Sequence, residues 1–152
     1  MIYCIDTSAF IDAFNRLYPK DVFTTLWDKV GDAAVDGTVL APDDVLTELS
    51  KKLDDLYKWA KLQAKLFYPL DKNLQLAVRQ IANRFPDFVN PPSGVVGADP
   101  FVVGLAELKS GIVVSHEKPR NNALKIPYVC AQLGIECIDF LEFIRRQGWT
   151  FK

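Results

Sequence analysis

Four acidic residues stand where a parallel α/β sheet would bring their side chains together: Asp6, Glu48, Asp99 and Glu117. Asp6 ends a short apolar run, and Glu117 lies two residues past another run of strand character. Glu48 falls in the first turns of a helix that follows a strand, and Asp99 begins a further helix. Because right-handed crossovers place such positions beyond the carboxyl ends of parallel strands, we expect all four at one edge of the sheet.

Carboxylates that meet in one crevice repel each other unless a cation or protons intervene. Ligand sets made only of oxygen, with open positions, suit Mg²⁺ or Mn²⁺, which keep waters and bind substrate phosphates. One or two such ions can activate water and stabilise the leaving oxygen of a phosphodiester. Zinc is disfavoured, because the single histidine, His116, and the scattered cysteines show no ligand spacing.

Each acidic position also has a structural alternative. Asp99 precedes a proline and could cap its helix, a role compatible with metal binding. Glu48 could pair with a neighbouring lysine on a solvated helix face, and Glu117 could be a loop carboxylate without a task. Asp6 is the hardest to explain in this way, since acids are rarely left at the end of a buried strand without a partner. His116 is expected near the crevice, although a lone loop histidine is more often solvated, and Asp12 is expected as an acid on a helix surface.

Two serines flank the proposed centre. Ser8 follows Asp6 by two residues, and Ser115 precedes Glu117 by two. Either hydroxyl could cap a helix, steady the Asp6 carboxylate or hold a water on the metal. Asn121 could contact a substrate phosphate or only shape a turn.

Alternating strands and helices predict a three-layer α/β/α fold with a central parallel sheet and a helical arm beside it. The expected strands are residues 2–5, 38–41, 112–115 and 135–138. The expected helices are residues 8–18, 21–36, 43 to about 68, 71–85, 100–109, 127–134 and 139–147. Residues 86–97 read as a loop, and residues 149–151 as a short edge piece.

The 152 residues fit one domain, residues 1–152, with a substantial core. No apolar run approaches the ~20 residues that span a bilayer, and the N-terminus lacks the features of a signal peptide. Cys4, Cys130 and Cys137 lie in apolar stretches, which predicts buried, reduced thiols in a cytoplasmic protein. The net charge of −1 gives no global attraction to nucleic acid, so such binding would need a local basic patch.

Taken together, these residues resemble the PIN-domain family, and especially its VapC-like toxin ribonucleases. The resemblance rests on four segments in order: Ile5-Asp6-Thr7-Ser8, Val45-Leu46-Thr47-Glu48-Leu49, Gly97-Ala98-Asp99-Pro100-Phe101 and Val113-Val114-Ser115-His116-Glu117. Typical members carry Thr-x-Asp at the fourth segment. Here the acid is one methylene longer, which indicates a divergent branch.

The resemblance implies a Rossmann-like parallel sheet and a single-strand RNA endonuclease that uses Mg²⁺ or Mn²⁺. It implies an acidic tetrad of Asp6, Glu48, Asp99 and Glu117. We hypothesise that Asp6 and Asp99 are the main metal ligands, that Glu48 is a ligand or orients water, and that Glu117 completes the site or binds through water. Toxins of this kind are silenced by an antitoxin protein and often form homodimers.

The resulting hypothesis is RNA phosphodiester hydrolysis, with the RNA backbone held by Lys118, Arg120 and Lys125. The arm also carries lysines that could hold RNA, although for most of them a solvated helix face is the favoured explanation: Lys51, Lys52, Lys58, Lys61 and Lys65. One rival keeps the fold without the activity, as a PIN-like module that binds RNA or protein. Another is a phosphatase of the haloacid dehalogenase type, which would need an aspartate where Ser8 stands.

Overall fold

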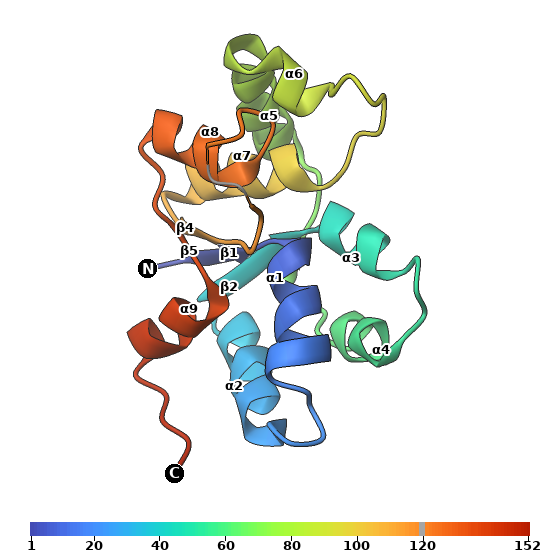
Figure 1. The fold of residues 1–152 in the computed structure, drawn as a ribbon, viewed down its shortest axis with the longest axis vertical. Coiled ribbons are helices and arrows are strands. Elements are labelled where there is room, and N and C mark those ends of the chain that lie inside the picture. Colours follow the sequence, from blue (N-terminus) through green and yellow to red (C-terminus); the bar gives the residue numbers. More distant parts are fainter. Residues whose placement is uncertain (119–120) are drawn as a thin grey trace.

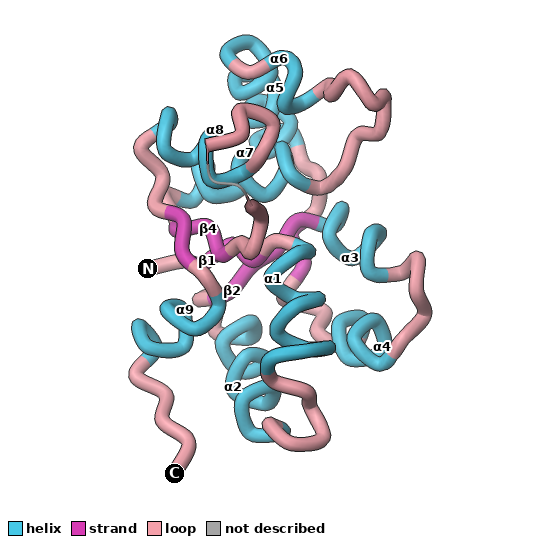
Figure 2. Tube along the Cα trace, viewed as in Figure 1, coloured by secondary structure: helices cyan, strands magenta, loops and turns pink. Residues whose placement is uncertain are grey.

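A parallel sheet runs through the middle of the protein and separates two groups of helices (Figure 2). The computed structural model describes residues 1–118 and 121–152. Within them, five strands form the sheet in the order β3-β2-β1-β4-β5, and all neighbouring pairs are parallel. The strands are β1 (Tyr3–Ile5), β2 (Val39–Pro42), β3 (Phe67–Tyr68), β4 (Ile112–Val114) and β5 (Cys137–Ile138).

The helices cover both faces of this sheet (Figure 1). One face carries α5 (Lys72–Arg84), α6 (Pro86–Val89), α7 (Asp99–Lys109) and α8 (Ile126–Leu133). The other carries α1 (Thr7–Asp12), its π-helical continuation η1 (Ala13–Leu17), α2 (Thr24–Val35), α4 (Asp55–Lys61) and α9 (Phe140–Gln147). α3 (Asp43–Leu49) follows β2 directly. The predicted three-layer α/β arrangement around a central parallel sheet is confirmed.

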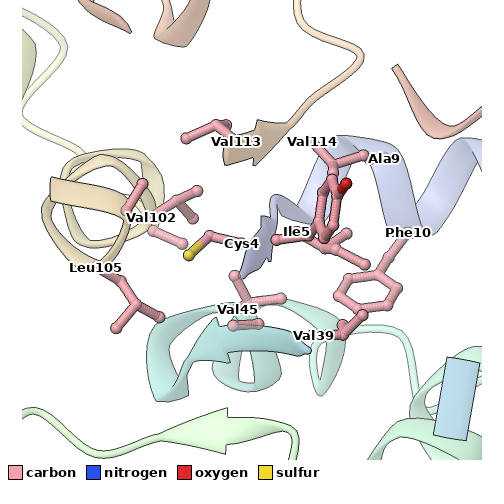
Figure 3. Close-up of a cluster of buried hydrophobic side chains, with 14 of the residues drawn as sticks. Cys4, Ile5, Ala9, Phe10, Val39, Val45, Val102, Leu105, Val113 and Val114 are labelled. Carbon is pink, nitrogen blue, oxygen red and sulfur yellow. The ribbon is translucent and has the colours of Figure 1, made fainter. Parts of the chain in front are cut away.

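The apolar character of β1 follows from its central place in the sheet. Successive residues of a strand point to opposite faces, and here both faces are covered by helices. Cys4 points toward Leu105 of α7, whereas Ile5 points the other way, toward Phe10 of α1 (Figure 3). Both β1 residues are fully buried. A strand of this kind can end in a carboxylate only where the sheet itself ends.

Aromatic side chains join the helices below the sheet. The ring of Trp27 in α2 lies 4.9 Å from that of Phe14, 5.1 Å from that of Trp59 and 5.5 Å from that of Phe140. Its indole N–H donates to the carbonyl oxygen of Tyr18 at 2.7 Å. Because these residues come from η1, α2, α4 and α9, their packing fixes the positions of α1 and α9 relative to each other.

The segment expected as one long helix from residue 43 to about 68 is broken. α3 ends at Leu49, α4 begins at Asp55, and Asp54 caps α4 by accepting a hydrogen bond from the Tyr57 amide. Leu53, which the helical spacing placed on the buried face, has a φ of 45° and is 70% exposed. β3, which pairs with β2, was not predicted, because a two-residue strand leaves no periodic signal.

Smaller differences concern element ends. α2 begins at Thr24 rather than near residue 21, because the residues before it form turns on the carbonyl oxygen of Pro19. The expected loop at residues 86–97 starts with the helical turn α6, and residues 149–151 form no strand. In the described part of the chain, every helix is too short or too polar to cross a membrane.

Candidate metal centre

The acidic residues gather at the point where the order of the strands reverses. From β1 the chain moves outward to β2 and β3, and it then returns to add β4 on the other side of β1. In open parallel sheets this reversal leaves a crevice beyond the carboxyl ends of the two central strands. Asp6 directly follows β1, and Ser115 directly follows β4. Carboxylate and hydroxyl oxygens therefore stand where the strand order of this sheet reverses.

Three carboxylates form a compact group among the described acidic residues. Asp6, Asp99 and Glu117 each contribute an oxygen atom that lies within 4.8 Å of the other two. Asp6 is 1% exposed, and the other two are half-buried. Asp99 is the first residue of α7 and Ala98 is the N-cap, so the alternative in which Asp99 caps this helix does not apply.

Asp6 divides its two oxygen atoms between different tasks. Its Oδ2 atom accepts hydrogen bonds from Ser8 Oγ at 2.6 Å and from Ser115 Oγ at 3.2 Å. Its Oδ1 atom is buried and accepts no hydrogen bond from any residue that the structure describes. A buried carboxylate oxygen without a donor is unfavourable, and a bound cation would satisfy it.

The pKa values show how poorly this group tolerates its own charge. Burial raises the pKa of Asp6 to about 6; the hydrogen bond from Ser8 opposes this rise, and the charges of Glu117 and Glu48 add to it. Burial, followed by the charges of Asp6 and Glu117, raises the pKa of Asp99 to about 9. A divalent ion would reverse both shifts, and three carboxylates are the ligands that Mg²⁺ or Mn²⁺ prefers.

Glu48 stands beside this group and connects helices. Its Oε1 atom accepts hydrogen bonds from Thr7 Oγ1 at 3.1 Å and from the Ala98 amide at 2.9 Å. These contacts replace the lysine pair that the sequence allowed as an alternative. Since Thr7 begins α1 and Ala98 precedes α7, Glu48 fixes the starts of two helices. Sequence reasoning missed both partners, because neither carries a local signal.

Glu117 uses its extra methylene to reach α8. One carboxylate oxygen, Oε1, accepts a hydrogen bond from the Ile126 amide at 2.8 Å, at the first residue of that helix. The Glu117 amide donates to Ser115 Oγ at 3.1 Å. An aspartate at this position would be about one carbon–carbon bond too short to make both the helix contact and the approach to Asp6.

His116 is not the solvated loop residue that the sequence predicted. Its side chain is 10% exposed, and Nδ1 lies 3.0 Å from Asp12 Oδ2. Its Nε2 atom accepts a hydrogen bond from the Phe140 amide at 3.0 Å. Asp12, expected as a surface acid, is thereby part of the surroundings of the site. The sequence contained a signal that Asp12 lies near the site, because Asp12 is four residues after Ser8 and therefore on the same face of α1.

The residues predicted to contact substrate lie next to the acidic group in the chain. Lys118 and Asn121 are exposed, and Lys125 is half-buried directly before α8. Arg120 lies outside the described residues. The structure thus gives the exposure of the three described side chains and tests no contact with a ligand.

Comparison with known proteins yields a shared fold. No curated protein matches the chain. Among solved structures, a crystal structure of FitAcB from Neisseria gonorrhoeae is similar, with 14% sequence identity and a TM-score of 0.51. The match covers 90% of this chain and 96% of the other, and at this identity it shows a shared α/β fold alone. Over residues 3–151 the sequence matches a family model, and the chain belongs to that family, described as "Domain of unknown function (DUF4411)".

Proposed function

We propose that this protein is a metal-dependent endonuclease of single-stranded RNA, related to the VapC-like toxins, in which Asp6, Asp99 and Glu117 bind Mg²⁺ or Mn²⁺. The observation that carries the proposal is the buried Asp6 Oδ1 atom, which lacks a donor among the described residues and belongs to a group of three carboxylates. A structural acid would be paired, whereas an acid that binds a cation needs an open oxygen.

The residues of the chain have distinct tasks in this proposal. Ser8 and Ser115 orient Asp6 by occupying one of its oxygens. Glu48 fixes the starts of α1 and α7 and adds negative charge near the ligands. When bound, the ion supplies Lewis acidity toward the phosphodiester and acidifies water. In the hydrolysis, a water oxygen bonds to phosphorus, the bond from phosphorus to a sugar oxygen breaks, and that leaving oxygen takes up a proton.

The substrate class comes from the resemblance and from the local charge. Lys118, Arg120 and Lys125 follow the last carboxylate in the chain and would hold backbone phosphates beside the metal, with Asn121 as a further donor. Five lysines between α3 and β3 are exposed, and the proposal gives them no role in binding RNA: Lys51, Lys52, Lys58, Lys61 and Lys65. Since the whole chain carries a charge of −1, binding would depend on this rim alone.

The test is cleavage of an end-labelled single-stranded RNA by purified protein with Mn²⁺, with Mg²⁺ and with EDTA. Asp6→Asn should abolish cleavage, whereas Asp28→Asn, which removes the same charge from an exposed position of α2, should not. Glu48→Gln keeps an acceptor for its two donors, and we expect it to retain more activity than Asp6→Asn.

The outcomes separate the proposal from its rivals. Cleavage that survives Asp6→Asn would place the activity elsewhere or reveal a contaminant. RNA binding without cleavage, in the presence of either metal, would favour a PIN-like binding module. Release of inorganic phosphate from a phosphomonoester without cleavage of RNA would favour a phosphatase.

The partners remain part of the same proposal. The resemblance to VapC-like toxins leads us to infer an antitoxin protein as the inhibitor and a homodimer as the active form. Light scattering on the purified protein measures the oligomeric state. Co-expression with the product of an adjacent small gene, followed by loss of RNA cleavage, tests the antitoxin. A monomer that no such product inhibits would contradict both inferences.

A further inference from the structure

We propose that His116 is a positioning residue of the metal centre, which ties the segment from Ser115 to Glu117 to α1 and α9. This inference rests on the proposed function, because it assigns His116 a role in metal binding by its neighbours. It goes beyond the four acidic positions, none of which contacts the imidazole ring through a hydrogen bond in the described structure.

Both ring nitrogens of His116 are engaged, and together they define one tautomer. The Phe140 amide can only donate, so Nε2 must accept, and the proton of a neutral ring lies on Nδ1. That N–H then donates to Asp12 Oδ2 at 3.0 Å. Arg16 contacts the same Asp12 oxygen at 3.3 Å. The ring is therefore held at one edge by α1 and at the other by the first residue of α9.

The backbone of the same residue reaches the metal ligands. The His116 amide donates to Ser8 Oγ at 3.0 Å, and Ser8 Oγ in turn donates to Asp6 Oδ2 at 2.6 Å. On one side, Ser115 Oγ donates to the same oxygen of Asp6. On the other, the Glu117 amide donates to Ser115 Oγ. A shift of His116 would thus move two hydroxyls and one carboxylate that surround Asp6.

Two features of the fold make the ring a suitable anchor. α1 and α9 lie on the same face of the sheet and are linked through the aromatic cluster of Phe14, Trp27 and Phe140 (Figure 1). Among the described residues, His116 and Glu117 lie beyond the last backbone pairing of this strand, from the Ser115 amide to the Ile138 carbonyl, so contacts that involve side chains hold them. Groups that orient metal ligands in this way usually change metal affinity tenfold or more when they are removed.

The structure also supplies a matched control on the same helix. Asp139 caps α9 by accepting a hydrogen bond from the Glu142 amide at 2.8 Å. Its side chain serves the same helix end as His116 but makes no described hydrogen bond to the segment from Ser115 to Glu117. Asp139→Ala should therefore weaken α9 without disturbing the metal ligands.

The experiment compares His116→Ala, His116→Asn, His116→Gln and Asp139→Ala with the parent protein. Asn retains a donor near the position of Nδ1, and Gln retains an acceptor near that of Nε2, so each variant can keep one of the two hydrogen bonds of the ring. The readouts are Mn²⁺ affinity, measured from the electron paramagnetic resonance signal of free Mn²⁺, and amide hydrogen exchange of residues 113–118 in metal-free protein.

We expect His116→Ala to weaken Mn²⁺ binding about tenfold or more and to speed exchange in residues 113–118. Asn and Gln should each recover part of both losses, and Asp139→Ala should lower the melting temperature with neither effect. Unchanged exchange and affinity in His116→Ala, or losses equal to those of Asp139→Ala, would overturn the proposal. If the parent protein binds no Mn²⁺, the proposed function fails, and the exchange data still decide whether His116 holds this segment.

Discussion

Three acidic residues of the site, Asp6, Glu48 and Glu117, are each oriented by hydrogen bonds to one oxygen atom. Ser8 and Ser115 occupy Oδ2 of Asp6, while its Oδ1 atom has no donor among the described residues. Glu117 gives its Oε1 atom to the Ile126 amide, and Glu48 gives its Oε1 atom to two donors. One oxygen per carboxylate thus sets the direction of the side chain. The charge that remains is what a cation would neutralise.

At the residue scale, the length of the fourth acid can be tested directly. We expect Glu117→Asp to weaken Mn²⁺ binding about threefold to tenfold, although aspartate is the acid of typical PIN domains. The shorter side chain cannot keep the Ile126 contact and approach Asp6 together, and losing one such hydrogen bond costs about 1 kcal/mol. Isothermal titration calorimetry measures the change.

Glu117→Gln is the companion variant for that measurement. It keeps the side-chain length and an acceptor for Ile126 but removes the charge, so its loss of Mn²⁺ affinity should exceed that of Glu117→Asp. Equal or tighter binding by Glu117→Asp would mean that the contact with α8 does not direct this carboxylate toward the metal.

At the scale of elements, the sequence predicted what long periodic segments and capping residues determine. α5, α7 and α9 lie within about one residue of their expected ranges, and Asp71 and Asp139 cap α5 and α9 through their side chains. The break between α3 and α4 was not predicted, because apolar residues continue at helical spacing through Leu53. The packing of α4 against the aromatic cluster determines where the chain turns between α3 and α4. The residues of that cluster lie far apart in the sequence, so local spacing does not reveal the turn.

The connection between α7 and β4 depends on a glycine for reasons of space. Ser110, and not Gly111, takes the left-handed conformation after α7, with a φ of 52°. A Cβ atom on Gly111 would lie 2.7 Å from the carbonyl oxygen of Ile2, in the segment that leads into β1. We expect Gly111→Ala to destabilise the protein by roughly 1–3 kcal/mol, because this oxygen belongs to the backbone and cannot move alone.

The control for Gly111→Ala is Gly31→Ala in α2. There the new Cβ atom would meet only the end of the Gln63 side chain, at 2.9 Å from Oε1, which can rotate away. Because alanine favours a helix over glycine, this variant should be neutral or more stable by up to about 1 kcal/mol. Urea unfolding of both variants measures the difference, and a similar loss in both would refute the steric argument.

At the scale of the whole molecule, the positions of the acidic residues were predictable and their contacts were not. Alternating strands and helices sufficed to place Asp6, Asp99 and Glu117 at one edge, since the topology of parallel sheets admits few arrangements. The roles of His116 and Asp12 depend on how α1 and α9 meet across more than 100 residues of chain. Local sequence patterns carry no information about contacts between residues so far apart in the chain.

Charge across the whole molecule makes a second prediction about RNA. With a net charge of −1, binding that relies on Lys118 and Lys125 should weaken steeply as salt rises. Lys118→Ala and Lys125→Ala should each reduce the slope of log affinity against log salt by about one. Fluorescence anisotropy with labelled RNA and catalytically inactive Asp6→Asn protein gives the slopes. Lys29→Ala, a change in α2, serves as the control, and an equal reduction there would argue against a local basic rim.

Stability of the whole molecule should depend on pH in a manner set by the metal centre. Asp6 and Asp99 have folded-state pKa values of about 6 and about 9, above the usual aspartate value, so the folded protein binds more protons than the unfolded chain. Their stabilising contribution is complete below about pH 4 and is lost as pH rises through each folded pKa. Asp12, Asp71 and Glu136 have lowered pKa values and act at lower pH. Burial also raises the pKa of Asp44, which therefore adds to this dependence in the same direction as the site.

Bound Mg²⁺ should restore the stability that the folded protein loses as the pH rises. We expect Mg²⁺ at about one hundred times its dissociation constant to add about 2.7 kcal/mol at pH 8, or roughly 5–10 °C in melting temperature. At pH 5 the shift should be much smaller, because protons on Asp6 and Asp99 compete with the ion. Differential scanning calorimetry with Mg²⁺ or EDTA tests this, with Asp28→Asn as the charge control. A shift of equal size at both pH values, or one that persists in Asp6→Asn, would place Mg²⁺ binding elsewhere than at Asp6, Asp99 and Glu117.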